Sequence, residues 1–445
     1  MKNIKQYIMG SDFLKSVSVL FSGNILANII SFAAIPLISR IYSKADFGEY
    51  AIFTSVSTII VNIVAFGLTA AIMAPKENEE SKKLLTTISL VEIICILVFA
   101  VAFVLLFPIS SFSGIRLNRF YIFALFILYT VFMGIYYLLS VYTNKLKLNR
   151  VLFWNALINS LSVAFLALPF GYIGLKSDGL IIAAILSFFL ADCQMAIKTR
   201  PFVKVNLLTE LKIIIQKYRD FVFYQFPSNL IGTFAQQYPN QAFSRFFGNA
   251  NLGGYAMCER ILGVPMRLIG SPINTVYFRH ASMYVKEGRN LSSFTFKLIC
   301  RLFLISYVPV ILLYIFSHDV FVFILGSEWE AVGELLSVLV LPYFMSFCCS
   351  CITYCLVVIN KQKVNLIITL LQFSVVATSI SLGYYMTGNF TDTIKIFAYG
   401  NVLVSTIHLL IIFYFLKDHF FKMATIILSY LLSVFVIGAL LNGNI

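Results

Sequence analysis

Charged residues are scarce in this chain, and their scarcity excludes a water-soluble globular protein. Only 12% of the 445 residues are charged, against roughly a quarter in ordinary soluble domains. Hydrophobic residues account for 60% of the sequence, and the mean hydropathy is +0.90. A soluble fold of this length cannot bury that much apolar surface, because its exterior needs polar cover. The composition therefore indicates an all-α polytopic membrane protein.

Histidine is also rare, which leaves little for hydrolytic or metal chemistry. The four histidines are scattered, and the sequence contains neither a Gly-rich phosphate loop nor a Ser/His/Asp arrangement. The eight cysteines lie in or beside apolar stretches, and the cluster CCSCITYC begins at Cys348. Cys349 and Cys351 stand two residues apart, which places them on different sides of a helix. We interpret the cysteines as packing residues and expect no metal, no cofactor and no enzymatic activity.

Acidic residues are fewer than basic ones, 19 against 33, so the net charge is +14. Such an excess is typical of membrane proteins, whose cytoplasmic loops collect Lys and Arg. With the N-terminus inside, the alternating cytoplasmic segments hold 23 basic residues and the outer segments hold six. We therefore interpret the charge as a sign of topology, expect a cytoplasmic N-terminus, and expect no nucleic-acid partner.

Thirteen apolar runs are long enough to cross a hydrocarbon core, which takes ~20 helical residues. All the connections between them are short, and the longest is the basic segment 199–218. The runs cover 14–39, 49–74, 84–107, 120–142, 150–171, 178–198, 219–247, 252–280, 297–317, 332–358, 363–387, 393–416 and 421–441.

A short internal repeat follows the first and the seventh run. SRIYSKADFGEY begins at Ser39, and SRFFGNANLGGY begins at Ser244, at an offset of 205 residues. Both copies are predicted to form the outer turn after the first span of a six-span half. Because six is even, the two halves enter the membrane in one orientation, as parallel transporter repeats do. The matched positions are Arg40, Gly48 and Tyr50, and Arg245, Gly253 and Tyr255.

The repeat divides the chain into four predicted parts. These are an N-terminal six-helix lobe (1–198), a basic cytoplasmic linker (199–218), a C-terminal six-helix lobe (219–416) and one additional C-terminal span (417–445).

Two stretches resemble a known family. The pattern P-x-x-S-R-x₆-F-G-x-Y from Pro36 to Tyr50 resembles the start of Wzx-type polysaccharide flippases, in the multidrug/oligosaccharidyl-lipid/polysaccharide exporter superfamily. HDVFVFILGSEW, from His318 to Trp329, is similar to another feature of that family. The resemblance implies two parallel six-helix repeats around a central cavity and transport by alternating access. The thirteenth span departs from the twelve that are usual in the family.

The same resemblance implies a location and partners. The location is the bacterial cytoplasmic (inner) membrane, with membrane lipid around the protein. The implied cargo is an undecaprenyl-pyrophosphate-linked oligosaccharide, that is, a polyprenyl-pyrophosphate-linked glycan for O-antigen or a similar surface polysaccharide. The polysaccharide polymerase machinery is a further expected partner.

Amide side chains follow one face of the seventh run, which also contains Pro227 and Pro239. Each proline removes a backbone hydrogen bond and favours a bend. Amides both donate to and accept from sugar hydroxyls, so this face suits a sugar pathway; interhelical amide bonding is the alternative. The first run is the counterpart of the seventh by the repeat. The pathway candidates are Gln225, Asn229, Gln236 and Asn240, with Asn24 and Asn28 in the first run.

Two arginines one heptad apart, Arg260 and Arg267, lie in the eighth run with Ser271 and Asn274 on the same side. Arginine meets phosphate oxygens with two parallel hydrogen bonds, so this stripe predicts a pyrophosphate contact. The alternative is a structural ion pair with Glu259, Glu92 or Asp192. Arg301, near the inner end of the ninth run, is a third phosphate candidate, or it extends to the interface.

Two acidic residues inside the runs, Glu92 and Asp192, are candidates for ion coupling, because a buried carboxylate can change its charge state usefully. An ion pair with an arginine is the alternative.

Three functions remain in view. A lipid-linked oligosaccharide flippase explains the paired halves and the basic stripe. An ion-coupled exporter of small organic molecules from the same superfamily predicts an acidic cavity, and a membrane glycosyltransferase or polymerase predicts a large catalytic loop.

Overall fold

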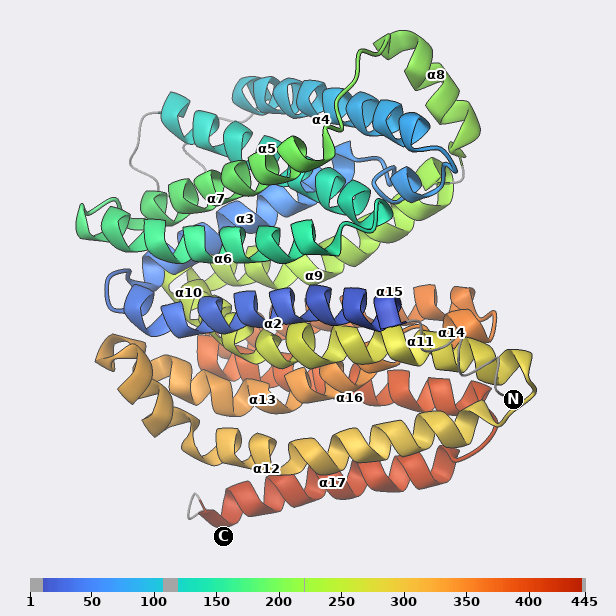
Figure 1. Ribbon diagram of the computed structural model, residues 1–445. Coiled ribbons are helices and arrows are strands. Elements are labelled where there is room, and N and C mark those ends of the chain that lie inside the picture. The colour runs from blue at the N-terminus through green and yellow to red at the C-terminus, as the bar shows by residue number, and fades with distance from the viewer. Residues whose placement is uncertain (1–10, 107–118, 220, 442–445) are drawn as a thin grey trace. The chain divides into compact units, whose positions relative to one another are not determined.

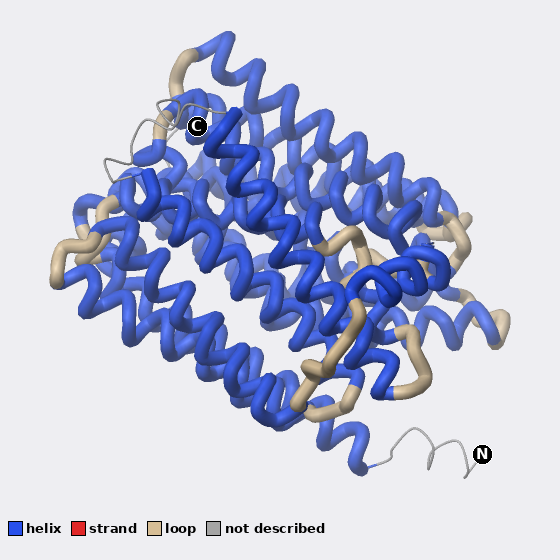
Figure 2. The backbone as a smooth tube through the Cα atoms, turned by 90° about the horizontal axis from the view of Figure 1, so that it is seen from above, coloured by secondary structure: helices blue, strands red, loops and turns tan. Residues whose placement is uncertain are grey.

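The computed structural model describes residues 11–106, 119–219 and 221–441, and their regular structure is helical (Figures 1 and 2). Within these residues, nine helices are long and apolar enough to cross a membrane. The polytopic helical fold is therefore confirmed. Residues 1–10, which include the expected cytoplasmic N-terminus, and residues 107–118, which include most of the predicted outer connection between the third and fourth runs, lie outside the described residues.

Helix covers most of each of the thirteen predicted runs, because run length is set by the thickness of the hydrocarbon core, but the runs 49–74, 219–247, 252–280 and 332–358 are each divided between two or three elements. The elements of the first half are α2 (Ser11–Ser39), α3 (Lys44–Val64), η1 (Ala70–Met73), α4 (Asn78–Leu106), α5 (Arg119–Lys145), α6 (Asn149–Tyr172), α7 (Lys176–Thr199) and α8 (Leu207–Lys217).

The second half starts with a π-helical turn and contains another. Its elements are η3 (Phe221–Gln225), α9 (Phe226–Phe247), α10 (Asn249–Pro265), η4 (Met266–Gly270), α11 (Ser271–Lys286), α12 (Leu291–Leu325), η5 (Ser327–Trp329), α13 (Glu330–Cys351), α14 (Cys355–Val358), α15 (Gln362–Thr387), α16 (Phe390–Phe415) and α17 (Phe420–Leu441).

The chain forms two compact units, and the division falls within α9. The first unit holds the described residues up to Tyr42 together with Glu49–Gln237. The second unit holds Tyr238 onward and, in addition, the short segment Ser43–Gly48 from the start of α3. The assignment of the six-helix lobes 1–198 and 219–416, of the linker and of the additional span remains a prediction.

In the first unit, α2, α6 and α7 pack together through paired polar groups and small residues. The Ser31 and Ser160 hydroxyl oxygens are 2.8 Å apart. The Tyr42 hydroxyl donates to the Ala167 carbonyl oxygen at 2.7 Å, and the Asn155 amide donates to the Ala191 carbonyl oxygen at 2.9 Å. Such bonds join helices in a membrane, where unpaired polar groups are unfavourable.

The second predicted run, 49–74, is not one helix. α3 ends at Val64, and a turn leads to the 3₁₀ helix η1. Gly67 in this turn has φ of 70°, a conformation that glycine adopts without steric strain. A side chain there would also meet the backbone, because a Cβ on Gly67 would lie 2.8 Å from the Phe221 carbonyl oxygen.

The predicted linker 199–218 contains the helix α8, which packs against α4 in the first unit. Lys217 pairs with Glu80 at 2.5 Å, and the Tyr218 hydroxyl donates to Glu80 at 2.8 Å. Lys217 and Tyr218 hold the pKa of the Glu80 carboxyl below its usual value. The linker is therefore a helix that is attached to its own unit.

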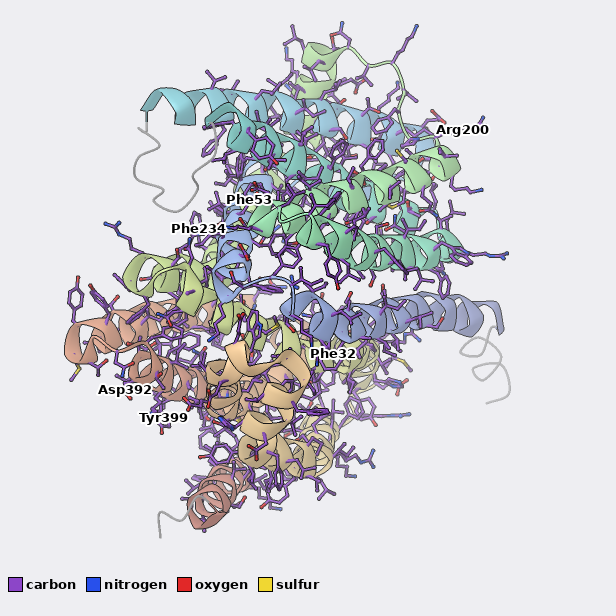
Figure 3. The ribbon with its side chains drawn as sticks, turned by 90° about the vertical axis from the view of Figure 1, so that its left-hand side faces the viewer. Phe32, Phe53, Arg200, Phe234, Asp392 and Tyr399 are labelled. Carbon is purple, nitrogen blue, oxygen red and sulfur yellow. The ribbon has the colours of Figure 1, made fainter. Side chains whose placement is uncertain are left out.

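In the second unit, the thirteenth predicted span, α17, lies beside α12 (Figure 1). The Tyr430 ring of α17 meets Phe303 edge-on, with centroids 4.7 Å apart, and stacks on Phe344 at 5.1 Å. Many large apolar side chains of the protein point outward instead. Phe32 of α2 is 41% exposed and Tyr399 of α16 is 66% exposed (Figure 3), as expected for surfaces that face lipid.

Candidate functional site

A carboxylate among polar groups lies at the middle of α10 in the second unit. The Glu259 carboxylate is within hydrogen-bonding reach of the hydroxyls of Tyr255 and Tyr343 and of the Asn240 amide. Tyr343 belongs to α13 and Asn240 to α9, so three helices converge on this one carboxylate. Hydrogen bonding of this kind offsets part of the cost of removing a carboxylate from water.

The Arg267 side chain folds back along α10 toward Arg260. Its Nη2 atom donates to the Arg260 carbonyl oxygen at 3.1 Å. Gly263 makes room for this path, because a Cβ at that position would lie only 2.7 Å from Arg267 Nη1. The Glu259 carboxylate is close enough to act electrostatically on the same guanidinium. We call Glu259, Arg260, Arg267 and Tyr343 the charged cluster.

The local backbone explains why Arg267 can turn back. Pro265 ends α10, and residues Met266–Gly270 form the π-helical turn η4 before α11 begins. Proline has no N–H, which removes one bond of the helical ladder. A π turn shifts the side chains that follow it relative to a regular helix, and such turns are common at functional sites.

The Arg260 side chain lies against an aromatic residue from the first half of the sequence. Its guanidinium carbon is 5.4 Å from the centroid of the Phe47 ring. Phe47 belongs to the segment Ser43–Gly48, which is part of the second unit. Trp329, at the end of η5, meets the Phe47 ring edge-on with centroids 5.2 Å apart.

The structure brings Arg260 and Arg267 together, whereas Arg301 lies on another helix, α12. Arg301 lies on an exposed face of α12, one helical turn before Leu304 and Ile305. These two residues are 77% and 73% exposed, and Val308 beyond them is 59% exposed. A long side chain on such an apolar face can reach the interface with its charged end. Its contact with cargo remains a prediction.

The amide candidates of the seventh run lie on η3 and α9. Gln225 ends the π turn, and its amide donates to the Asn229 side chain at 2.8 Å. Gln225, Asn229 and Gln236 are exposed and belong to the first unit, whereas Asn240 is buried and belongs to the second. The candidates therefore do not form one cluster within a single unit.

The remaining polar candidates are more dispersed. Asn274 of α11 has a buried Oδ1 atom without a hydrogen-bond partner among the described residues. Ser271 begins α11, and its side chain lies outside the described part of the chain. Asn24 is exposed on α2, and the Asn28 amide donates to the Asn24 carbonyl oxygen at 2.8 Å. Their part in a sugar pathway remains a prediction.

Two buried carboxylates lie in the first unit, on α4 and α7. Glu92 is 2% exposed and Asp192 is 6% exposed. Glu92 Oε2 and both carboxylate oxygens of Asp192 have no hydrogen-bond partner among the described residues. Both helices pack against α5, and Gly134 of α5 faces Glu92. The charged cluster belongs to the other unit.

The turn motifs mark equivalent helix starts. α3 begins at Lys44 and α10 begins at Asn249, which reproduces the sequence offset of 205 residues. Gly48 and Gly253 are buried in helix contacts, and Tyr255 is buried as well. Arg40 and Arg245 are exposed near the ends of α2 and α9, and Tyr50 is half-buried in the first unit.

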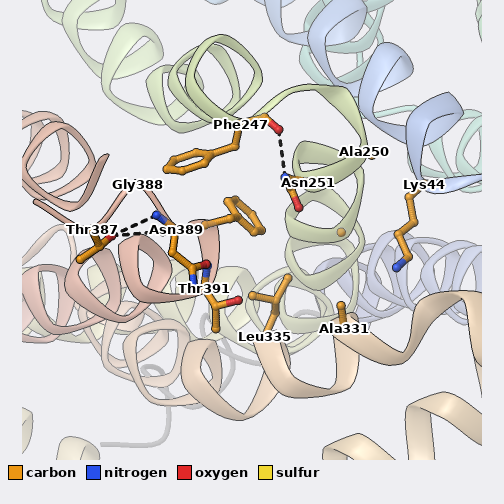
Figure 4. A pocket seen from close by; sticks show the side chains of 12 residues that line it. Lys44, Phe247, Ala250, Asn251, Ala331, Leu335, Thr387, Gly388, Asn389 and Thr391 are labelled. Atoms are coloured by element: carbon orange, nitrogen blue, oxygen red, sulfur yellow. Dashed lines mark hydrogen bonds between the residues drawn. The ribbon is translucent and has the colours of Figure 1, made fainter. Parts of the chain in front are cut away.

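A cavity of about 440 Å³ lies in the second unit near the starts of α10 and α16 (Figure 4). Lys44, Phe247 and Gly254 are among its lining residues. The side-chain amides that line the cavity form hydrogen bonds at helix ends. Asn251 donates to the Phe247 carbonyl oxygen at 2.9 Å, and Asn389 accepts from the Thr391 N–H at 3.0 Å. These bonds account for the amides as structural groups.

Sequence reasoning missed Tyr343 and did not assign Glu259 to a functional site. It treated Glu259 only as a pairing partner for arginine, and it did not consider Tyr343. A carboxylate next to an arginine inside an apolar run was the available signal for Glu259. Tyr343 carries no comparable signal, because its position beside α10 depends on how α13 packs.

Solved structures of membrane transporters share this fold. The chain is similar to the lipid II flippase MurJ in an inward closed conformation, with 15% identity and a TM-score of 0.66 over 95% of this chain and 97% of that chain. It is also similar to an inward-facing multidrug resistance MATE family transporter of the MOP superfamily, with 14% identity, a TM-score of 0.58, and coverage of 91% and 98%. A third similar structure is a mutant of the Vibrio cholerae MATE transporter VcmN, with 12% identity and a TM-score of 0.55 over 92% of this chain and 97% of that chain. The protein therefore has the fold of multi-pass membrane transporters.

The sequence itself places the protein within a family. The model of the polysaccharide biosynthesis protein family matches residues 37–334, and the chain belongs to this family. The resemblance to Wzx-type flippases is thus confirmed at the family level. Among curated proteins, no relative matches.

Proposed function

We propose that this protein is a flippase for undecaprenyl-pyrophosphate-linked oligosaccharide repeat units of O-antigen or a similar surface polysaccharide. It moves them from the cytoplasmic to the periplasmic leaflet by alternating access. Membership in the polysaccharide biosynthesis family supports the cargo class, and the transporter fold supports translocation. The observation that carries the proposal is that Arg267, in η4, folds back to Arg260, in α10, beside a carboxylate.

The chemistry of the charged cluster suits a pyrophosphate. Arg260 and Arg267 supply N–H groups in planar forks, which match phosphate oxygens in pairs. Glu259 is the internal counter-charge when the site is empty, so the guanidiniums are not left as isolated charges in an apolar region. An entering pyrophosphate takes over that role. Arg301 is a further phosphate contact in this proposal.

The sugars follow the exposed amides. Gln225, Asn229 and Gln236 present donors and acceptors along η3 and α9, where glycan hydroxyls can exchange water for amide bonds. In this proposal the other members of the pathway are Asn240, Asn24, Asn28, Ser271 and Asn274.

Transport is coupled to an ion through the first unit in this proposal. Asp192 and Glu92 support this role because their oxygens are buried without partners among the described residues. A carboxylate in that setting is strongly unfavourable while charged, so binding of a proton or a metal cation changes the energy of the unit.

A second candidate function is ion-coupled export of small organic molecules. The likeness to the MATE fold and the buried acidic pair Glu92 and Asp192 favour it. An organic cation would be repelled by Arg260 and Arg267, which is why we place this function second. The two candidates differ in a measurable way, because only the flippase binds pyrophosphates.

The proposed function also implies a membrane, an orientation and a partner for the protein. The protein lies in the bacterial inner membrane with its N-terminus in the cytoplasm, which is supported by the distribution of basic residues. The polymerase that receives the repeat units on the periplasmic side is the expected partner.

Complementation tests the proposal. In cells that lack the native gene, Arg267→Ala is expected to abolish surface polysaccharide and to leave lipid-linked glycan on the cytoplasmic side, with the protein still in the membrane. Arg267→Lys restores part of the export, because it keeps the charge without the planar fork. Arg150→Ala, at an exposed position at the start of α6, is the matched control. Normal export by Arg267→Ala would contradict the phosphate role.

Thiol labelling tests the sugar pathway. Cysteines placed at Asn229 and Gln236 should react with a membrane-impermeant thiol reagent, since both positions are exposed and polar. Cysteine at Leu304, which is 77% exposed on α12, is the control for a surface that faces lipid. If reagent reaches neither Asn229 nor Gln236, the pathway along α9 is wrong.

A further inference from the structure

The two sequence stretches that resemble the flippase family meet in the second unit. Phe47 comes from the first stretch and Trp329 from the second, and their rings are 5.2 Å apart at an angle of 85°. Arg260 lies over the Phe47 ring at 5.4 Å. Phe47 is 2% exposed and Trp329 is fully buried. We call these two rings the aromatic support.

We propose that the aromatic support positions the Arg260 guanidinium for the anionic headgroup of the cargo. This inference rests on the proposed function. Phe47 and Trp329 are positioning residues, because they act on Arg260 and do not themselves bind the cargo.

The geometry of a guanidinium explains why an aromatic ring suits this task. The group is planar and carries its five N–H donors around its edge. A ring placed against its face attracts the positive charge and occupies none of those donors. A carboxylate in the same place would bind the donors and would compete with the cargo phosphate. Phe47 therefore orients Arg260 through the face of the guanidinium and takes up none of its N–H donors.

Local structure fixes the direction of Phe47. Ser43 and Asp46 form a capping box at the start of α3: the Asp46 carboxylate accepts from the Ser43 N–H at 2.9 Å and from its hydroxyl at 2.7 Å. Gly48 then lets the helix start approach α10, since a Cβ there would lie 1.8 Å from the Asn249 carbonyl oxygen. The capping box and Gly48 together place Phe47 beside Arg260.

Trp329 fixes the orientation of the Phe47 ring. It ends the turn Gly326–Trp329, where the Trp329 N–H donates to the Gly326 carbonyl oxygen at 3.0 Å. An edge-on contact sets the plane of the partner ring, because the positive edge of one ring meets the negative face of the other. The plane of Phe47 in turn sets the plane of the guanidinium.

Simple packing is the competing explanation, because Phe47 is a core residue. The two explanations differ in what they predict for substitutions. If Phe47 only fills space, Leu serves nearly as well as Tyr or Trp, and the loss does not depend on Arg260. If Phe47 positions Arg260, aromatic residues outperform aliphatic ones, and the effect disappears when Arg260 is removed.

Binding of geranyl pyrophosphate to the purified full-length protein in nanodiscs provides the test. Phe47→Leu is expected to weaken binding about three- to tenfold, a range typical of a partly desolvated cation–π contact. Phe47→Tyr and Phe47→Trp should bind more tightly than Phe47→Leu. In an Arg260→Gln background, Phe47→Leu should produce no further loss. Phe47→Met replaces Leu if the Leu variant does not fold.

Phe53→Leu is the matched control. Phe53 is a buried residue of α3 whose ring meets Tyr129 edge-on at 5.3 Å, and it lies in the first unit. Its substitution should leave geranyl pyrophosphate binding unchanged. Equal weakening by Phe47→Leu with and without Arg260 overturns the inference, as does unchanged binding by Phe47→Leu while Arg260→Gln binds weakly. If Arg260→Gln and Arg267→Gln both bind the probe as the wild type does, the proposed function itself fails.

Discussion

Gly48 and Gly253 pack reciprocally, each against the start of the other's helix. A Cβ on Gly48 would lie 1.8 Å from the Asn249 carbonyl oxygen, and a Cβ on Gly253 would lie 1.8 Å from the Lys44 carbonyl oxygen. Asn249 is 205 residues after Lys44, and Gly253 is 205 residues after Gly48. The weak sequence repeat is therefore a structural one, and its two copies touch.

Any side chain at these glycines meets backbone rather than a movable side chain. We expect Gly253→Ala to lower the stability of the second unit by about 1–3 kcal/mol, a range typical of overpacking. Gly254→Ala is the matched control, since a Cβ there would lie 3.5 Å from Leu335 Cδ1, an ordinary contact. Thermal unfolding in detergent gives the comparison. Equal melting temperatures for the two variants would contradict the backbone contact.

Gly263 offers a way to move Arg267 without changing its charge. An added methyl would lie 2.7 Å from Arg267 Nη1, so the guanidinium must leave the Arg260 carbonyl oxygen. We expect Gly263→Ala to fold normally, because the end of a long side chain can shift, and to bind geranyl pyrophosphate several-fold more weakly. Titration of the probe into both proteins measures this. Undiminished affinity would show that the folded-back position of Arg267 is irrelevant to binding.

Glu259 moderates the charge of the two arginines. Glu259→Gln keeps polar atoms for the hydroxyls of Tyr255 and Tyr343 and removes the negative charge. The arginines then attract a pyrophosphate more strongly, so we expect tighter probe binding together with slower export, because release becomes harder. Binding titration and a polysaccharide assay in cells give the two readouts. Weaker probe binding by the variant would mean that Glu259 orients the arginines rather than offsets their charge.

Much of the fold could be predicted from the sequence, because the bilayer dictates how long an apolar run must be. α15, at Gln362–Thr387, matches the predicted run 363–387 within a residue. The break after Val64 escaped prediction, since apolar residues continue past it and the turn is revealed by the positive φ of Phe66 and Gly67 in the structure. The π turn at Met266–Gly270 is similarly invisible to a search for helical periodicity.

The site was harder to predict than the fold. Spacing along the eighth run placed Arg260 and Arg267 close together, and the two residues do meet, although Arg260 lies in α10 and Arg267 in η4. It said nothing about Tyr343 or Phe47, whose positions depend on packing between helices. The exposed face that Arg301 shares with Leu304 also depends on which sides of α12 are covered by neighbouring helices.

Asp192 is the sharper test of ion coupling, because neither of its oxygens has a hydrogen-bond partner among the described residues. A charged carboxylate in that position opposes folding, so Asp192→Asn should be at least as stable as the wild type. Export by the variant should lose its dependence on the ion gradient. Export measured with and without an uncoupler checks this, and Ser187→Ala, on the same helix, is the control. Coupled export by Asp192→Asn would exclude Asp192 from the mechanism.

The attachment of α8 to α4 should depend on pH through Glu80. Lys217 and Tyr218 stabilise the charged carboxylate and lower its pKa from the ordinary value of 4.5. Because the pKa of Glu80 is lower in the folded state than in the unfolded state, the contact stabilises α8 fully at pH values above the ordinary pKa. This stabilisation is lost as the pH falls through the lowered pKa of the folded state. Hydrogen exchange of residues 207–217 should therefore accelerate in that acidic range and resemble exchange in Glu80→Gln.

Glu79→Gln is the matched control for this prediction, because Glu79 pairs with Lys82 on the same helix and is 68% exposed. Glu79 and Lys82 are three residues apart within α4 and do not connect it to α8, so removal of this pair should leave hydrogen exchange in α8 unchanged. The contact between Glu80 and Lys217 joins segments that are distant in sequence, so its loss should expose α8 alone. If Glu79→Gln and Glu80→Gln accelerate exchange equally, general surface charge rather than this contact holds α8 in place.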